Sequence, residues 1–544
     1  MAGAMGTDLV RQDTSGTDAV AAVAVAVSAV LFGLSIVALA EGISITGTVA
    51  GVSTVALLGA LLVLLGGAVV SFGVGSRLEF VSTTPDASAG LIAGAAGAVP
   101  WFVVGAGAAT LLLGSGGIGL VVGGLLLGGV AFAATVLPRE DVGSTVPIGA
   151  LPALTGLVFL TGTLGPEWVW DLGWEQTASL TAEFVIPVAT LSNAMLAGWA
   201  AAKAYGGFGA RGRHLGAYVL VYLNALSIVA FLFVLVAFTV VQGVPGLLTG
   251  VQFGLGVGPE TTLGLFGLEL SFRWPVSIPF LMNGVALLNE FNGVLPAIVG
   301  TVWLVVGAVL FAVPLAVGAA IFLTEYAEQG AFTRAVEIAT NGLWSTPSIV
   351  FGLFGFAFLI PRFGNSKSLL SGMLTLGFML LPLVLITSRE AMLSVPDEYR
   401  DASAALGVTR WQTIRSVVLP AALPGVVTGV ILGVGRIAGE TAPILLTMAG
   451  GTFVPGGQTV DVIGGFEFTS APPFVANPEL LQATSALPYQ LFALITAGVG
   501  LGENVANPDE FRWATALVLL AVVLTFYAIG IGTRYYFRRK LRHE

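Results

Sequence analysis

The sequence contains no cysteine and only two histidines among its 544 residues. Without cysteine the chain has no disulfide, no thiolate nucleophile and no Cys-ligated metal or iron–sulfur cluster. The histidines, His214 and His543, are far apart in the chain, so we expect no His-based metal site. Charge is scarce as well, at 9% of residues against about a quarter in soluble domains. This scarcity excludes a soluble enzyme, a disordered protein and a nucleic-acid binder.

A phosphate-binding lysine is also missing. A nucleotide-binding P-loop needs Gly-Lys-Ser or Gly-Lys-Thr, so that backbone amides and the lysine surround the phosphates. None of the three lysines, Lys203, Lys367 and Lys540, follows a glycine. We therefore expect no cofactor and no catalytic site in this chain, and a separate subunit must bind any ATP that drives it.

Long uncharged runs are what the sequence has in abundance. Apolar residues make up 56% of the chain, and its mean hydropathy is +0.95. One membrane-spanning helix needs about 20 mainly apolar residues. The run 87–138 is too long for one helix, and we divide it at the glycine-rich cluster 114–117. The sequence thus predicts an all-α polytopic membrane protein with about twelve spans, at 19–40, 52–74, the two halves of 87–138, 146–165, 183–202, 215–242, 297–323, 341–361, 368–388, 424–448 and 513–533.

Lysine and arginine in the short loops predict the orientation, because cytoplasmic loops carry an excess of both. With the N-terminus inside, the cytoplasmic loops hold most of these residues, from Arg77 to the basic tail 534–542. The outer segment 451–511 has acidic residues and no basic residue. Arg362 and Lys367 disagree, because they fall in a predicted outer loop, where they either attract an anion or are simply solvated. We expect both termini to be cytoplasmic and membrane lipid to surround the spans.

The chain changes character near residue 205. Residues 1–204 are rich in Gly, Ala, Val and Leu, with short loops and no charge inside the predicted spans after Glu183. Their simplest interpretation is a lipid-facing bundle of about six helices, an extension whose role the sequence does not reveal. The segment 204–209 is a plausible hinge to the second part of the chain, 205–544.

The cytoplasmic loop 389–423 is the most informative segment of the second part. Residues 402–406 favour a helix, and Gly407 stops it with a permissive backbone. Residues 408–418 suit a second short helix that ends at Leu419-Pro420. On these physical grounds alone, a helix pair that docks into another protein and an ordinary interfacial helix are equally good interpretations.

The spacing in this loop resembles the EAA loop of ABC importer permeases, which reads Glu-Ala-Ala, three residues, Gly, nine residues, Ile, one residue, Leu-Pro. The chain has Asp401-Ala402-Ser403, then Gly407, Val417 and Leu419-Pro420 at the same spacing. Other segments resemble the phosphate importer permeases of PstA type, namely 319–327, 347–355, 387–391, 434–443 and, more weakly, 486–490. The resemblance covers about 210–540 and leaves out 1–204.

The resemblance implies that six C-terminal helices form a type I ABC importer permease core. Such permeases pair with a second homologous permease, a cytoplasmic ATPase dimer and an extracytoplasmic phosphate-binding protein. The EAA-type loop would contact the ATPase through Asp401, Ala402, Ser403, Gly407, Leu419 and Pro420.

Arg436 and Glu440 are the other distinctive residues. If 424–448 is one helix, they share a face at i and i+4, and Arg436 lies near the middle of the hydrocarbon core. A charge there costs at least about 2.5 kcal/mol, so it should face a pore or a partner. A buried ion pair between helices is one interpretation. The other, favoured by the resemblance, is a substrate pathway of Arg436, Glu440 and Thr441 in which Glu440 balances the arginine when the anion is absent.

The leading hypothesis is therefore the membrane subunit of an ATP-driven phosphate importer. A permease for another oxyanion, such as molybdate or sulfate, would use the same mechanism. An ion-coupled secondary transporter should show discontinuous helices and intramembrane charges in both halves, and the sequence has such charges in one half only. A membrane scaffold would need neither the docking loop nor the intramembrane arginine.

Overall fold

The computed structural model describes residues 16–49, 51–113, 117–170, 179–258, 260–265, 268–284, 293–328, 330–449, 459–470, 472, 474–496 and 507–540. Two compact units make up the chain, Met1–Phe238 and Thr239–Glu544. The glycine-rich break at 114–116 and His543 lie outside the described residues. The proposed domain boundary near residue 205 precedes the division between the compact units, which falls inside a long helix.

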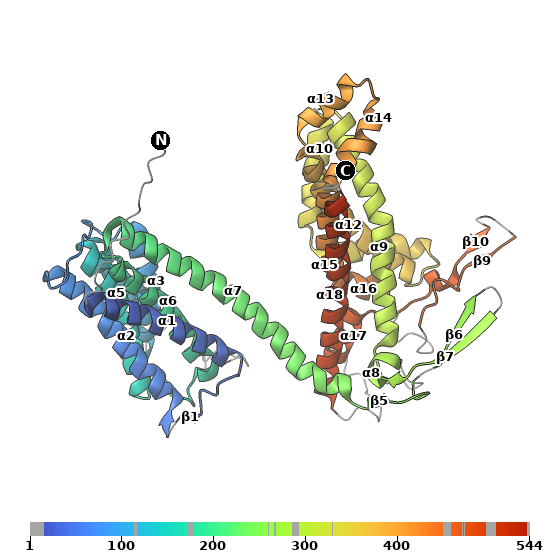
Figure 1. The fold of residues 1–544 in the computed structure, drawn as a ribbon. Coiled ribbons are helices and arrows are strands. Elements are labelled where there is room, and N and C mark those ends of the chain that lie inside the picture. The colour runs from blue at the N-terminus through green and yellow to red at the C-terminus, as the bar shows by residue number, and fades with distance from the viewer. Residues whose placement is uncertain are drawn as a thin grey trace, which may run out of the picture. The chain divides into compact units, whose positions relative to one another are not determined.

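Seven long helices belong wholly or largely to the first unit: α1 Gly16–Leu39, α2 Thr54–Arg77, α3 Leu91–Leu113, α4 Ile118–Val136, α5 Glu140–Leu160, α6 Ala182–Tyr205 and α7 Gly209–Leu248, whose last ten residues belong to the second unit (Figure 1). Two minimal hairpins accompany them, β1 Thr48–Val49 with β2 Val52–Ser53, and β3 Val169–Trp170 with β4 Leu180–Thr181.

Glycines allow a close helix contact in this unit, between α2 and α5. A Cβ on Gly66 would lie 2.4 Å from the carbonyl oxygen of Gly149, and a Cβ on Gly59 would lie 2.8 Å from that of Gly156. Small residues let helix backbones approach closely, which is how helices associate in lipid without a hydrophobic driving force between them. The Gly- and Ala-rich composition of this part of the chain thus builds an interior as well as a lipid-facing surface.

The helix ends of the first unit carry a buried charge cluster, which corrects the expectation that charges sit in loops. Glu140 and Asp141 form the first turn of α5 and Lys203 lies in the last turn of α6, and all three are almost completely buried. Lys203 Nζ lies 2.8 Å from Glu140 Oε1. Asp141 accepts hydrogen bonds from Ser76 Oγ at 2.9 Å and from Arg139 Nε at 2.9 Å. The ion pair and hydrogen bonds of this cluster connect the ends of α2, α5 and α6.

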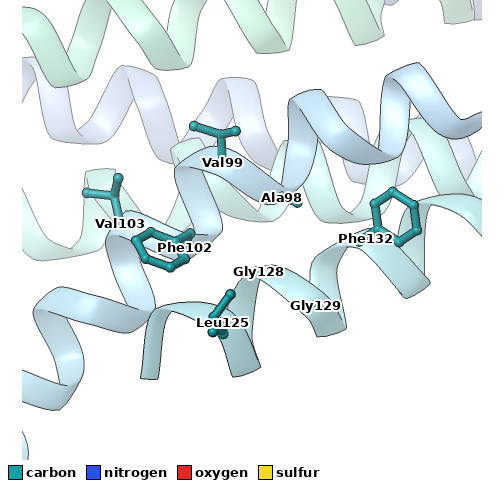
Figure 2. A pocket seen from close by; sticks show the side chains of 8 residues that line it. All are labelled: Ala98, Val99, Phe102, Val103, Leu125, Gly128, Gly129 and Phe132. Atoms are coloured by element: carbon teal, nitrogen blue, oxygen red, sulfur yellow. The ribbon is translucent and has the colours of Figure 1, made fainter. Parts of the chain in front are cut away.

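The helices α3 and α4 enclose an open apolar pocket of about 390 Å³, which Figure 2 shows. Phe102 and Phe132 line it together with Gly128 and Gly129, and every lining residue is apolar or glycine. The pocket has no group that could hold an anion, and such a surface is typical of helices that face lipid tails.

The second unit is built around four long helices, and its remaining elements are short. The elements are β5 Gln252–Phe253, β6 Glu260–Leu265, β7 Leu268–Arg273, β8 Val276–Ser277, α8 Pro279–Met282, α9 Leu295–Ile321, η1 Phe322–Tyr326, α10 Ala331–Ser345, α11 Ser348–Phe354, η2 Gly355–Leu359, η3 Ile360–Arg362, α12 Leu369–Leu393, α13 Asp397–Ala405, α14 Arg410–Thr413, η4 Ile414–Val418, α15 Leu419–Ala438, α16 Ala442–Thr447, β9 Glu467–Phe468, β10 Val475–Ala476, η6 Pro478–Leu481, α17 Leu487–Thr496 and α18 Pro508–Lys540.

The core of this unit lies between α9 and α12, with α15 packed beside α12. In Figure 1, α10, α13, α14 and the C-terminal end of α18 lie at one end of the unit, and α8 and β5 lie at the opposite end. The strands form antiparallel pairs, β5 with β8, β6 with β7 and β9 with β10, and the β6–β7 pair lies between β5 and β8 in the chain.

Among the described residues, eleven helices are long and apolar enough to cross a membrane, or twelve if one bent pair is a single span. The predicted number of about twelve is thus confirmed, and the chain is a multi-pass, all-α membrane protein. The bent pair is α10 with the helix 348–362, at an angle of 102°. The span predicted at 341–361 therefore corresponds to the second arm of this pair, and the sequence did not predict the bend.

Pro347 is the reason for the bend. Proline disfavours helical geometry in the residue before it, and Thr346 adopts an extended backbone with φ −69° and ψ 133°. The helix α10 accordingly ends at Ser345 and a new helix starts at Ser348.

Candidate functional site

Arg436 lies in the last turn of α15, close to a break in the chain. The helix ends at Ala438, residues Gly439 to Thr441 are not helical, and α16 begins at Ala442. The predicted single helix 424–448 is therefore wrong, and Glu440 does not share a helical face with Arg436. Pro443 stands in the first turn of α16, where its missing N–H costs nothing and its fixed φ suits the start of a helix.

The break nevertheless leaves the two charges near each other. Arg436 Nε lies 4.0 Å from Glu440 Oε1, beyond hydrogen-bond distance. The side chain of Arg436 is 33% exposed and that of Glu440 is 19% exposed. The counter-charge therefore holds the guanidinium only loosely, and part of the Arg436 side chain is exposed on the surface of this chain.

Trp344 is a third member of this site, which sequence reasoning missed. The Arg436 guanidinium carbon lies 4.5 Å from the centre of the Trp344 ring, in range of a cation–π interaction. Trp344 reaches this position from the end of α10, one residue before the chain bends. The only sequence signal was Pro347 three residues later, which marks the bend but not the partner.

The remaining candidates lie on the elements that follow. Thr441 stands at the N-terminal end of α16 and makes no capping hydrogen bond with its side chain. Lys367 Nζ donates to the carbonyl oxygen of Leu445 at 2.8 Å, and burial lowers the pKa of this lysine. Arg362 lies 3.7 Å above the ring of Phe358 and also donates to its carbonyl oxygen. Both outer-loop cations thus have protein partners.

The loop 389–423 is called the coupling loop from here on, after its predicted role. Its predicted helix–glycine–helix is present as α13, Gly407 and α14. Gly407 has φ +74°, a left-handed conformation that side-chain-bearing residues adopt only with strain. Thr409 and Gln412 form a capping box that starts α14, with each side chain bonded to the other residue's backbone. Local sequence alone is enough to build this turn.

The tip of the loop presents an exposed surface. Asp401 and Ala402 are exposed, whereas Ser403 is buried and donates its hydroxyl to the Tyr399 carbonyl at 3.0 Å. Large apolar side chains are also exposed here, namely Leu406, Val408 and Trp411. Apolar groups gathered with charge on a loop tip are typical of a protein-docking surface.

The sequence predicted that the second helix of the loop ends at Leu419-Pro420. This prediction is wrong, because the helical backbone continues through these residues. A π-helical turn, η4, joins α14 to α15, and the amide of Leu419 donates to the carbonyl of Ile414. Because Pro420 has no N–H, an α-helix would leave a carbonyl unpaired here, and the wider π turn adjusts the register. The docking loop therefore continues directly into the helix that carries Arg436.

A sequence profile of the family described as "binding-protein-dependent transport system inner membrane component" matches residues 312–543. The phosphate transport system permease protein PstA of Haemophilus influenzae is 34% identical over 265 residues, which are 49% of this chain and 83% of that protein. The chain belongs to the PstA-type permeases of this family. Residues 1–204 lie outside the family match.

Two further likenesses were found. The "Probable ABC transporter permease protein YqgH" of Bacillus subtilis is 36% identical over 195 residues, and the match covers 32% of this chain and 63% of that protein, less than two thirds of its length. The MetNI methionine ABC transporter in an inward-facing conformation matches at 17% identity with a TM-score of 0.33, over 44% of this chain and 94% of that one. The latter likeness is too low to bear on function.

The PstA-type assignment confirms the type I ABC importer permease fold that the motif spacing implied. The matched region holds loop 389–423, the whole bent pair and the Arg436 site. The chain is a membrane transport subunit, and the roles of its individual site residues stay predictions.

Proposed function

We propose that this PstA-type permease carries inorganic phosphate across the cell membrane. The observation that carries the proposal is the state of Arg436, whose side chain is one-third exposed and whose Nε lies 4.0 Å from its counter-charge. The name of the Haemophilus influenzae relative supports phosphate as the anion.

The chemistry of the site fits a tetrahedral oxyanion. A planar guanidinium can donate two parallel hydrogen bonds to two phosphate oxygens. The Trp344 ring covers one face of this guanidinium, so the ligand is restricted to its edges. Glu440 competes for the same group, which keeps the anion weakly bound and lets it leave. Thr441, at the start of α16, can add a hydroxyl donor.

The proposed orientation follows from charge. The basic residues Arg538, Arg539 and Lys540 end α18, at the same end of the second unit as α13 and α14 (Figure 1). Because cytoplasmic segments are enriched in Lys and Arg, we assign this end to the cytoplasm. The proposal also places both termini in the cytoplasm. The exposed tip of α13 and α14 then docks the ATPase dimer, and the opposite end receives the phosphate-binding protein. A second homologous permease completes the channel.

Reconstitution tests the substrate. The permease, its partner permease, ATPase and binding protein are placed in proteoliposomes, and phosphate uptake is measured with and without ATP. We expect uptake that needs ATP, together with phosphate-stimulated ATP hydrolysis. Stimulation by molybdate or sulfate without phosphate would identify another oxyanion. Uptake that follows an ion gradient without ATP would replace the proposal with a secondary transporter.

Loop variants test the ATPase contact. We expect Gly407→Pro, which forbids the observed φ of +74°, and Asp401→Arg to detach or uncouple the ATPase without unfolding the spans. Because the chain has no native cysteine, Ala402→Cys and Thr409→Cys allow clean cross-linking. The assignment is wrong if neither exposed cysteine reaches the ATPase in the assembled complex.

A further inference from the structure

A buried carboxylate sits beside the coupling loop, and the predicted function does not use it. Glu325 lies in η1, the π-helical turn that ends α9, and its side chain is 7% exposed. Arg400, on α13, donates to Glu325 Oε1 from Nη2 at 2.9 Å. The two residues are 75 positions apart in sequence, so the pair joins the loop to a different spanning helix.

The same guanidinium also bonds to the end of α12. Arg400 Nη2 donates to the Met392 carbonyl at 3.0 Å, and Nη1 donates to the Val395 carbonyl at 2.7 Å. Nη1 also lies 3.2 Å from Asp397, whose side chain is 89% exposed. One side chain therefore connects α13 with α9 through Glu325 and with α12 through two carbonyls.

The packing around α13 leaves few other attachments. Within α13, all of which the structure describes, Ser403 is the only buried residue. The apolar cluster nearby consists of Ala320, Met392, Val395, Val418 and Ala422, none of them on α13. Because the helix has so little apolar contact, the hydrogen bonds of Arg400 are a main attachment of α13 to α9 and to the end of α12, beside its contacts with α14 and η4.

We propose that the Arg400–Glu325 ion pair is a mechanical link, through which displacement of α13 by the ATPase moves the inner ends of α9 and α12. The proposal rests on the proposed function of α13 as the ATPase contact. A charge-assisted pair with several hydrogen bonds resists separation more than a single neutral hydrogen bond does. A displacement of α13 is therefore transmitted through the Arg400 guanidinium to α9 and α12. Arg400 and Glu325 are thus positioning residues that touch neither ATP nor phosphate.

The test separates this link from a merely structural ion pair. Arg400→Gln leaves the buried Glu325 carboxylate without its cation, which lowers stability as well as breaking the link, whereas Glu325→Gln breaks the link and leaves Arg400 with its two carbonyl partners. The double variant removes both charges and so restores most of the stability, but it has no ion pair. Reconstituted complexes are compared by phosphate taken up per ATP hydrolysed, alongside the thermal unfolding midpoint of the complex.

We expect uptake per ATP to fall about tenfold in both single variants and in the double variant alike, since one charge-assisted bond is lost in each. Arg400→Lys, which keeps the charge, should recover part of the ratio. Asp397→Asn is the matched control, because it changes a solvated partner of the same guanidinium, and it should leave the ratio unchanged.

Restored stability with a normal uptake-to-ATP ratio in the double variant would overturn the link and leave an ion pair that only supports folding. An equal loss of the ratio in Asp397→Asn would overturn it too. Failure of the proposed function is distinguishable, because the unmodified complex would then show no ATP-dependent uptake at all.

Discussion

The two units of the chain each contain a Lys or Arg paired with a glutamate near a helix end, and the two pairs are built differently. Lys203 and Glu140 lie 2.8 Å apart with side chains 2% and 0% exposed, whereas Arg436 and Glu440 lie 4.0 Å apart and are 33% and 19% exposed. The second carboxylate oxygen of Glu140 also accepts two backbone amides. A close, buried pair holds helices together, and a looser, partly exposed one keeps hydrogen-bonding capacity for a ligand.

The comparison also changes how the first unit is understood. Glu140 accepts the amide of Gly209 at 2.9 Å, and the Gly207 carbonyl accepts the amide of Thr84 at 3.0 Å. Phe208 between them is 1% exposed. The segment 204–209, a plausible hinge from its glycines, is a packed turn that holds the start of α7 on this unit.

Removing the loosely held arginine should have the largest effect on transport. Arg436→Gln should lower phosphate uptake about 100-fold, since two charge-assisted hydrogen bonds to the anion are lost at about 1.5 kcal/mol each, while the complex stays assembled. Arg436→Lys should keep partial activity. Arg362→Gln is the matched control, because Arg362 also lies over an aromatic ring in the same unit. Near-normal uptake in Arg436→Gln would make the Arg436–Glu440 pair structural, like that of the first unit.

Breaking the buried pair should lower stability more than it lowers intrinsic transport. Lys203→Met leaves Glu140 as a buried charge and should cost about 3–5 kcal/mol of unfolding free energy, seen as a lower thermal unfolding midpoint of the full chain. Adding Glu140→Gln should recover part of the loss. Arg211→Met, at an exposed position on α7, serves as the control. An unchanged midpoint in Lys203→Met would show that the buried pair does not hold the helices.

Trp344 gives a smaller, graded test of the anion site. Trp344→Leu removes the cation–π contact, worth about 1 kcal/mol, and should weaken uptake about fivefold at limiting phosphate. Trp344→Phe should lose less. Phe358→Leu removes the corresponding ring under Arg362 and should have no effect on uptake. Equal losses in the two leucine variants would mean that Trp344 has no special place in the pathway.

Deleting the first unit should have the smallest effect on transport itself. A chain that begins at Tyr205 keeps α7, whose Gly243 and Gly246 lie against α18 so closely that a Cβ would meet backbone oxygens at 2.7 and 2.4 Å. We expect this chain to assemble and to take up phosphate, because the family match begins only at residue 312. Loss of uptake despite normal membrane levels would make the extension part of the pathway.

Some features of this protein were determined by the sequence alone, because they depend on neighbouring residues. Uncharged runs of about 20 residues predicted the spans, since a helix must cover the bilayer with apolar groups. The spacing from Asp401 through Gly407 to Pro420 predicted the turn of the coupling loop, since a glycine with φ +74° and a local capping box are enough to form it.

Other features were decided only by the tertiary structure. The pairs Arg436–Trp344, Arg400–Glu325 and Lys203–Glu140 join residues on different helices, and no local pattern indicates which partner a charge will find. The helix boundaries near Pro347 and Pro420 also needed the fold. A helix ends before Pro347, whereas the helix at Pro420 continues through a π turn. The physical reason is the same for the ion pairs and for the helix boundaries. The free-energy cost of a charge or of an unpaired carbonyl depends on its burial and on its partners, and distant parts of the chain supply both the burial and the partners.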